Sequence, residues 1–376
     1  MLKPIHRVAC SPALAACQQL MRHFALWLCD AGTTGAQINQ QGLLPPVLGS
    51  AIEANWLWAF LQRFNAGQSL LSRAQTVAAM PIAQKANLVT WIQTVSALAT
   101  QFQPQPAPTP LPINRPVANE SDWKSFKALM EAFYEIGLRD GLPYLPNCLP
   151  TAAGGVKYAD YVNAFRNAHR LSAVHHAREI CWLCGGPLGD TPHVDHWIIK
   201  SAFPLLSVCA DNLQLICSTC NQAPNKGRKP VHSAGSFADW FHPYLRPGNG
   251  ALRLDYVPAS FSLRCAAITP SDKSKAANLD TLLNLTSRWT REFKAEYANH
   301  QKVLIRREQS RLKSAHARHT QIEILSYVQR WQKDLMVDEP HHEVHQALAT
   351  ALQEPSRLAA WHSDLATIKP KPPPLP

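Results

Sequence analysis

The sequence predicts a mainly α-helical protein with a small zinc-bound module, made of two short strands and a helix, in its middle. Three observations support this fold class. Apolar residues recur at helical spacing within residues 1–102, and the region beyond residue 246 is predicted to be helical as well. Two Cys-x-x-Cys pairs lie in the middle of the chain, far enough apart to enclose a hairpin and a loop. A proline-rich stretch separates the first helices from the rest.

The length and composition suggest two or three domains and a polyanionic partner. The chain has 376 residues, of which 46% are hydrophobic and 17% are charged, so it can bury real cores. Lys and Arg number 37 against 26 Asp and Glu, which gives a formal net charge of +11. This positive balance suits nucleic acid as a partner. No run approaches the length of a membrane span, so no membrane partner is expected.

The cysteines indicate a reducing compartment. Four of the ten form the two Cys-x-x-Cys pairs, and the others are scattered without the spacing of a disulfide framework. This usage predicts a cytoplasmic protein. Near the N-terminus, Lys3 and Arg7 precede a weak apolar run, but Pro12 interrupts it, which favours the start of a helix over a signal peptide.

Residues 1–102 are predicted to form a helical N-terminal domain. Pro12 stands in the first turn of a helix that ends near Gly32. Ser50 can cap a second helix, and Pro81 can open a third. The apolar residues of these helices have the spacing of a helical core, and charges are few. This region is therefore predicted to be a packing or docking domain.

Residues 103–120 are rich in proline and are predicted to form an extended, semi-rigid linker; a ligand for a proline-binding module is the alternative. Residues 121–177 are predicted to form a helical lead-in to the central module. Within it, Ser121 caps a helix to about Arg139, and a basic helix covers about 157–178. A basic helix at this place can contact phosphates, and a solvated face is the alternative.

The two Cys-x-x-Cys pairs predict a structural zinc site. Zinc in structural sites takes four tetrahedral ligands, and paired knuckles supply them from Cys181, Cys184, Cys217 and Cys220. Two redox pairs or four unrelated cysteines are the alternatives, and the doubled knuckle favours zinc. Four thiolates leave no open position for a substrate, so this ion is predicted to be structural.

The segment around the second knuckle has the order strand, long loop, strand, helix. Residues 193–198 are predicted to form a short strand and residues 212–216 a second one. The segment after Cys220 starts a short helix. Together with the zinc site, these elements make up a predicted module that spans residues 178–245.

This module resembles an HNH endonuclease of the ββα-metal fold, in its four-cysteine zinc subtype. The residues that carry the resemblance are the two Cys-x-x-Cys pairs, Asp195-His196, Ser201-x-Phe203-Pro204-x-x-Ser207-Val208, Asn212-Leu213, Asn221 and Lys226-Gly227. A later segment, Phe241–Tyr244, resembles one that follows the motif in some bacterial HNH proteins.

The resemblance implies a metal-dependent nuclease. His196 is the expected general base, because imidazole titrates near neutral pH and a water must lose a proton as it attacks a phosphodiester. Asp195 and Asn221 are the expected ligands of a catalytic divalent ion, and their oxygen donors favour Mg²⁺ or Mn²⁺ over zinc. Asn212 is expected to fix the loop that aims the base, through side-chain hydrogen bonds to backbone.

The chain departs from the family pattern at one place. The family usually has two residues between the helix asparagine and the lysine, whereas four separate Asn221 from Lys226. Asn225 shares a helix face with Asn221 and is the alternative metal ligand, although Pro224 limits regular helix to its first turn. His193 lies two residues before Asp195, the expected metal ligand, and so on the same face of a regular strand. It is predicted either to contact a ligand of the metal or to be a half-buried strand histidine.

Residues 246–376 are predicted to form a basic helical C-terminal domain with a disordered Pro/Lys tail from Lys369 onward. About half of all Lys and Arg residues lie here. A long helix from about residue 278 places apolar residues on one side and basic residues on the other. The basic side chains predicted to contact nucleic acid, in this helix and after the second knuckle, are Lys226, Arg228, Lys229, Arg291, Lys294 and Lys302. Ordinary solvation is the alternative for them.

The predicted function is a metal-dependent HNH endonuclease that hydrolyses DNA, one strand per active site. A double-strand break needs two copies or two events, and the helical flanks are the expected place for a second copy or a protein partner. Because HNH nucleases of bacteria often serve defence or mobile elements, the resemblance implies an anti-phage or mobile-element effector. Two alternatives stand beside it: a non-catalytic zinc-stabilised module that binds nucleic acid, and an RNA-cutting toxin, since such a site does not choose DNA over RNA by itself.

Overall fold

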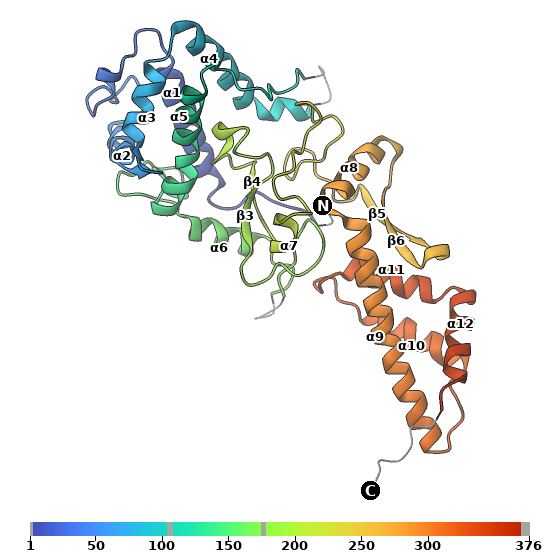
Figure 1. The fold of residues 1–376 in the computed structure, drawn as a ribbon. Helices are drawn as coiled ribbons and strands as arrows, with labels where there is room; N and C mark the ends of the chain where they lie inside the picture. The colour runs from blue at the N-terminus through green and yellow to red at the C-terminus, as the bar shows by residue number, and fades with distance from the viewer. Residues whose placement is uncertain (1–2, 104–107, 174–177, 370–376) are drawn as a thin grey trace. The chain divides into compact units, whose positions relative to one another are not determined.

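The computed structural model describes residues 3–103, 108–173 and 178–369 of the chain (Figure 1). Helices make up most of its regular structure, and the strands are few and short. The predicted mainly α-helical fold is therefore confirmed. None of the described helices is both long enough and apolar enough to pass through a membrane. The predicted disordered tail falls almost entirely outside the described residues.

The chain divides into two compact units. The N-terminal unit comprises Pro4–Arg170 and Thr191–Gly248, and the C-terminal unit comprises Met1–Lys3, Leu171–Asp190 and Asn249–Pro376. This division differs from the predicted boundaries, because residues 178–190 group with the C-terminal helices and residues 191–245 with the N-terminal ones. Each unit is described separately below.

The N-terminal unit is built mainly from helices that start where the sequence predicts. Pro12 lies in the first turn of α1, the Ser50 side chain accepts the Glu53 backbone N–H at the start of α2, and α4 follows Pro81 directly. The main elements are α1 (Ser11–Leu28), α2 (Ala51–Leu61), β1 (Phe64–Asn65), β2 (Gln68–Ser69), α3 (Leu70–Ala78), α4 (Ile82–Ser96), α5 (Glu120–Ala132), α6 (Tyr158–Ala168), β3 (His193–His196), β4 (Leu213–Ile216) and α7 (Ser218–Asn221). Short helical turns η1 (Gly35–Gln37), η2 (Leu98–Phe102), η3 (Phe133–Leu138) and η4 (Pro204–Leu206) connect them. The predicted basic helix over about 157–178 is shorter than expected: α6 ends at Ala168, and residues 174–177 lie outside the described part.

Aromatic packing in the N-terminal unit holds the loop between β3 and β4. Trp91 of α4 contacts Phe126 of α5 edge to face, with ring centroids 6.0 Å apart. It also stacks on Phe203 of the loop, at 6.3 Å. All three rings are buried. Burying this much apolar surface favours one position of the loop relative to the helices. The other residues of the loop are therefore held in place as well.

Helix α5 continues into a π-helical turn, η3, which brings a tyrosine to β3. A π turn places one extra residue in a helical turn and is common at functional sites. Here it presents Tyr134, whose hydroxyl donates to the Val194 carbonyl at 3.3 Å. The next residue, Glu135, forms an ion pair with Lys200 at 2.7 Å. The turn therefore contacts the strand that carries Asp195 and His196 and also the loop that follows it.

The proline-rich segment packs on the N-terminal unit over its described part and is not a free spacer there. The backbone N–H of Leu111 donates to the Gly235 carbonyl at 3.0 Å, and the Gln101 side chain donates to the Thr109 carbonyl at 2.9 Å. Leu111 and Val117 are 2% and 1% exposed. The prediction of a free linker was based on the prolines and did not consider these two apolar side chains. Their burial favours packing on the unit, although the prolines favour an extended backbone. Residues 104–107 lie outside the described part.

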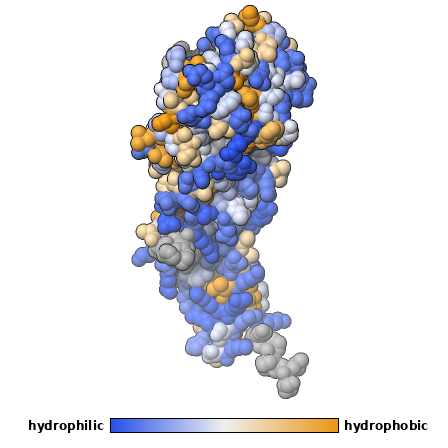
Figure 2. Space-filling model, turned by 90° about the vertical axis from the view of Figure 1, so that its left-hand side faces the viewer, coloured by the Kyte–Doolittle hydropathy of each residue, from blue (hydrophilic) through white to orange (hydrophobic). Residues whose placement is uncertain are grey.

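The C-terminal unit combines a β-hairpin with five helices. Strand β5 (Leu252–Val257) pairs antiparallel with β6 (Ser262–Ala267), and the hairpin packs on α8 and α9. The helices are α8 (Lys273–Leu283), α9 (Leu285–Lys313), α10 (Gln321–Asp334), α11 (His342–Leu352) and α12 (Pro355–Ala366), with turns η5 (Pro258–Ser260) and η6 (Pro270–Asp272). As predicted, α9 buries Trp289, Phe293 and Leu304 on one side. In Figure 2, hydrophilic residues dominate the lower part of the surface in view, where α9–α12 lie in Figure 1.

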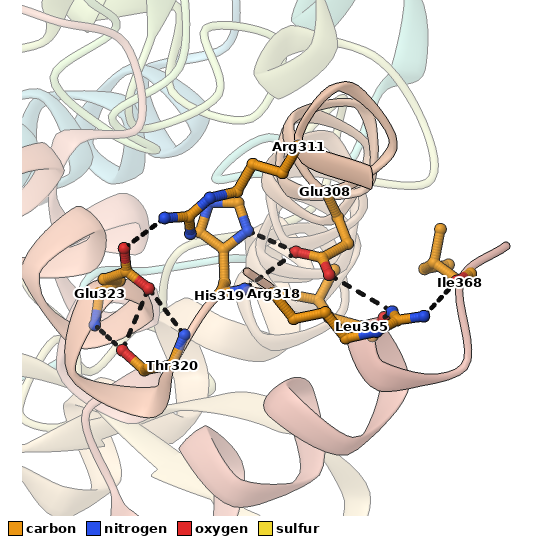
Figure 3. A network of polar contacts seen from close by, with 8 residues as sticks. All are labelled: Glu308, Arg311, Arg318, His319, Thr320, Glu323, Leu365 and Ile368. Atoms are coloured by element: carbon orange, nitrogen blue, oxygen red, sulfur yellow. Dashed lines mark hydrogen bonds and ion pairs between the residues drawn. The ribbon is translucent and has the colours of Figure 1, made fainter. Parts of the chain in front are cut away.

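A buried carboxylate anchors the end of α9. Glu308 is fully buried, and it accepts hydrogen bonds from the backbone and ring of His319 at 3.1 and 2.6 Å (Figure 3). Arg318 pairs with the same carboxylate at 3.3 Å and donates to the carbonyls of Leu365, in the last turn of α12, and Ile368, just after it. The carboxylate therefore ties α9, the start of α10 and the end of α12 together.

Replacing Glu308 with glutamine is expected to lower the free energy of unfolding by about 2 kcal/mol at neutral pH, because it removes a charged partner from these hydrogen bonds. Burial by itself raises the pKa of Glu308, but the bonds from His319 outweigh it, so the pKa lies below the usual 4.5. The advantage of the wild type is therefore full above about pH 4.5 and shrinks as the pH falls through the lower folded pKa. Urea unfolding of wild type and Glu308→Gln at several pH values measures this difference in the free energy of unfolding. Glu339→Gln is the control, because Glu339 is an exposed glutamate of the same unit. Equal stability of wild type and Glu308→Gln at pH 7 would contradict it.

Candidate functional site

The residues predicted to do chemistry lie on a short hairpin followed by one turn of helix. Strand β3 pairs antiparallel with β4, so that Asp195 lies opposite Gln214 and His196 opposite Leu213. Helix α7 follows β4 directly and ends at Asn221. These elements stand at the predicted places in the chain. Every residue of β4 is buried, and so is β3 beyond its first residue.

Asn212, just before β4, fixes the loop that leaves β3. Its side-chain oxygen accepts the Ile198 backbone N–H at 2.7 Å, and its amide donates to the carbonyls of Ile198 and Leu206 at 2.9 and 3.2 Å. The residue is completely buried. Because three backbone groups at both ends of the loop depend on one amide, this side chain makes the contacts that a loop-positioning residue needs. It touches no group that reacts.

His196 ends β3 and is held through one ring nitrogen. Its Nε2 lies 2.8 Å from the Ser207 carbonyl, which can only accept, so Nε2 carries the proton and Nδ1 has the lone pair. The Tyr134 ring packs edge-on against the imidazole, with centroids 4.5 Å apart. Burial, helped by the nearby ammonium groups of Lys200 and Lys226 and opposed by the bond to the Ser207 carbonyl, lowers the pKa of His196 to about 3. The ring is therefore neutral at neutral pH, as a general base must be.

Asp195 is paired with a lysine. Its Oδ1 lies 2.9 Å from Nζ of Lys226, and its Oδ2 accepts from Nε2 of Gln214 at 2.9 Å. Nζ of Lys226 also donates to the carbonyl of His196 at 2.8 Å. Burial raises the pKa of Asp195, and the bonds from Lys226 and Gln214 oppose that rise. Both carboxylate oxygens thus have partners within the protein.

The two asparagines proposed as metal ligands differ in surroundings. Asn225 is 7% exposed, and its amide donates to the Thr219 carbonyl at 2.7 Å, which closes the turn after α7. Asn221, at the end of α7, is half-buried. His193, at the start of β3, is exposed. The structure therefore gives Asn225 a backbone contact that Asn221 does not make, and it leaves His193 on the surface.

The Phe241–Tyr244 segment packs against the hairpin. The indole N–H of Trp197 donates to the Phe241 carbonyl at 3.2 Å, and the Tyr244 hydroxyl donates to the Leu213 carbonyl at 2.7 Å. His242 is completely buried, and burial lowers its pKa to about 3. This segment therefore supports the strands from outside and contributes no exposed group to the site.

Four buried cysteines form a cluster that can hold a metal ion such as zinc. The sulfurs of Cys181, Cys184, Cys217 and Cys220 all lie within 4.8 Å of one another, and no other such group of His, Cys, Asp or Glu occurs in the described ranges. Tetrahedral zinc–thiolate bonds place sulfurs about 3.8 Å apart, so the set fits a four-thiolate site. The backbone N–H of Cys220 points at the sulfur of Cys217, at 3.4 Å, which is a contact that stabilises a thiolate.

The predicted nucleic-acid contacts divide into two groups. Lys226 is 1% exposed and pairs with the buried carboxylate of Asp195, so it is not on the surface in this structure. The exposed or partly exposed members are Arg228, Lys229, Arg291, Lys294 and Lys302.

The sequence interpretation gave no role in the site to Gln214, Tyr134 or Ser207, although Ser207 is part of the motif that carries the resemblance. Gln214 could have been found, because the strand register places it opposite Asp195. Tyr134 and Ser207 could not, since Tyr134 is remote in sequence and Ser207 acts through its backbone. Comparison of the chain with family models, curated proteins and solved structures gives no match. The functional argument therefore depends on the geometry of the chain's own residues.

Proposed function

We propose that the protein is an HNH-type endonuclease that hydrolyses phosphodiester bonds in DNA, with the hairpin β3–β4 and α7 as a ββα-metal module. One observation carries this proposal: His196 has a defined tautomer, with Nε2 bound to the Ser207 carbonyl on a loop that Asn212 fixes. A ring held in this way keeps the Nδ1 lone pair in one direction, which is what a general base requires.

In the proposed reaction, Nδ1 of His196 takes a proton from the water that attacks phosphorus, the bond between phosphorus and the 3′ oxygen breaks, and the 3′ oxygen takes a proton from solvent water. The base gains a positive charge as the phosphate gains negative charge. A bound phosphodiester therefore raises the pKa of the imidazole from the low value that burial gives it. Asn212 keeps the ring in place and exchanges no proton.

A catalytic Mg²⁺ or Mn²⁺ is the part of the proposal that comes from the resemblance. The expected ligands are Asp195 and Asn221, with Asn225 as the alternative. The observed surroundings do not favour a divalent ion at Asp195, because the buried ammonium of Lys226 already pairs with this carboxylate and would repel a second cation. We therefore assign no step to this ion, and the dependence of cleavage on added Mg²⁺ or Mn²⁺ tests it.

The basic side of α9 supports nucleic acid as the partner. Arg291, Lys294, Lys302 and Arg306 are all exposed. At about 100° per residue they lie within about one third of the helix circumference, and they extend over about 23 Å. Across the described ranges none of these four cations has an ion-pair partner. A row of unpaired charges on a rigid helix matches a phosphate backbone.

Neutralising this row is expected to weaken DNA binding and to flatten its salt dependence. In the variant with Arg291, Lys294, Lys302 and Arg306 all changed to Gln, the slope of log K against log salt should fall in magnitude by up to about 4. Fluorescence anisotropy with a labelled duplex at several salt concentrations measures this slope.

The matched control changes the same number of charges at cations that already have carboxylate partners, namely Arg63, Arg115, Lys124 and Arg139. The control should keep most of the wild-type slope. Equal slopes for both variants would mean that only the net charge matters, and that α9 has no special role.

A second function has an observation in its favour. Asp195 and His196 are 6% and 9% exposed, and a non-catalytic module that binds nucleic acid needs no accessible base. That reading predicts no cleavage by wild type. An RNA-cutting toxin is distinguished by the polymer that is degraded. The test incubates the zinc-loaded protein with supercoiled plasmid and with single-stranded RNA, each with EDTA, Mg²⁺ or Mn²⁺. Cleavage of DNA alone supports the proposal, and binding without cleavage of either polymer supports the non-catalytic module.

A further inference from the structure

The ammonium of Lys226 lies between Asp195 and His196 in the candidate site. Its side chain is 1% exposed, which is rare for a lysine. The ammonium lies 2.9 Å from Oδ1 of Asp195, 2.8 Å from the His196 carbonyl and 5.9 Å from the centre of the Trp197 ring. All of these partners belong to three consecutive residues of β3 and the loop after it.

The backbone fixes this position of the lysine. The Lys226 N–H donates to the Cys220 carbonyl at 3.1 Å, and the Lys226 carbonyl accepts from the Lys229 N–H at 2.8 Å. The preceding Asn225 donates to the Thr219 carbonyl. Two bonds, from Asn225 and from Lys226, therefore tie the turn to α7, and the four residues between Asn221 and Lys226 form the turn that places the ammonium beside Asp195.

The ammonium and a divalent ion compete for the carboxylate. Oδ2 of Asp195 accepts from Gln214, and Oδ1 pairs with Lys226. Mg²⁺ binds carboxylate oxygens at about 2.1 Å, so an ion on either oxygen would lie within a few ångströms of the ammonium. Two cations this close in a buried site repel strongly. A divalent ion is therefore expected to bind Asp195 only weakly while the buried ion pair is intact.

We propose that Lys226 is a resident cation that closes the Asp195 carboxylate to divalent ions in the free protein. This inference rests on the proposed function, which makes Asp195 a metal ligand. Binding of a divalent ion and withdrawal of Lys226 are then coupled. A withdrawn ammonium needs another anion, and the phosphodiester backbone of a bound nucleic acid supplies one. The free protein therefore binds divalent ions weakly at Asp195, and bound nucleic acid makes their binding more favourable.

The test measures Mn²⁺ binding by electron paramagnetic resonance, with the zinc-loaded full-length chain and without DNA. Wild type and Asp195→Asn are expected to bind Mn²⁺ equally weakly. Lys226→Met is expected to bind about a hundred-fold more tightly, because the cost of breaking the pair is gone. The double variant Asp195→Asn/Lys226→Met should lose this gain, and Lys226→Arg, which keeps the charge, should bind as weakly as wild type.

Two controls keep the result clear. Lys200→Met removes the same charge beside the same site, where Lys200 pairs with Glu135 at the surface, and it should show no gain. Lys226→Gln is the second variant in case Lys226→Met does not fold, with folding checked by circular dichroism and zinc content. Tight Mn²⁺ binding by wild type that Asp195→Asn abolishes would overturn the proposal, and so would folded Lys226 variants without a gain. These outcomes are measured without cleavage, so failure of this inference is distinguished from failure of the proposed function, which would show as folded, zinc-loaded wild type that cuts no nucleic acid.

Discussion

Replacing His196 with alanine is expected to lower the rate of DNA cleavage by about 10²- to 10⁴-fold while DNA affinity stays the same. The imidazole keeps the Nδ1 lone pair for the attacking water, because Nε2 is bound to the Ser207 carbonyl, and its removal leaves the Asn212 contacts with the loop in place. Single-turnover cleavage of a labelled duplex gives the rate, and anisotropy with the same duplex gives the affinity.

His193→Ala is the matched control, because His193 lies on the same strand and is exposed. It should cleave at nearly the wild-type rate. If His196→Ala cleaved as fast as wild type, the base would have to be another residue. If it lost affinity and rate together, His196 would be a residue that maintains structure.

Replacing Cys217 with serine is expected to remove the bound zinc and to lower the melting temperature by about 10 °C or more. The four sulfurs of the cysteine cluster are buried within 4.8 Å of one another. Without a bound metal, no bond joins these four cysteines, and the segments that carry them lose this connection. Zinc bound by four thiolates contributes a large part of the folding free energy of small domains. Elemental analysis measures the zinc, and circular dichroism measures the melting temperature.

Cys148→Ser is the control for this substitution, since Cys148 is a free cysteine outside the cluster. It should keep one zinc ion per chain and the wild-type melting temperature. A strong chelator should reproduce the effect of Cys217→Ser in the wild type. Wild-type protein that purifies without zinc, or Cys217→Ser with unchanged zinc and stability, would contradict the assignment.

The parts of the site that the sequence could predict are those set by local spacing. The cysteine pairs fix their own geometry, because each Cys-x-x-Cys turns back on itself. The capping contact of Ser50 and the helix start after Pro81 depend on the residues next to them, and both were predicted. The backbone contacts of Asn212 are expected from the family resemblance, and they lie within one loop.

The parts that the sequence could not predict depend on contacts between distant residues. The sequence suggests a surface role for Lys226, since nearly all lysines are exposed, and only the folded turn after α7 shows that it is buried against Asp195. Likewise, the proline-rich segment suggests a spacer until Leu111 is seen to pair with Gly235. Such contacts need the tertiary structure, because no local pattern encodes them.

The most direct test of the central claim is nicking of supercoiled plasmid by the zinc-loaded protein with Mg²⁺ or Mn²⁺, followed by DNA ligase. The account predicts open circles with wild type and not with His196→Ala, and it predicts that ligase reseals them, because hydrolysis that releases the 3′ oxygen leaves a 3′ hydroxyl and a 5′ phosphate. Supercoiled plasmid that stays intact with folded, zinc-loaded wild type, or open circles formed equally by His196→Ala, would contradict it.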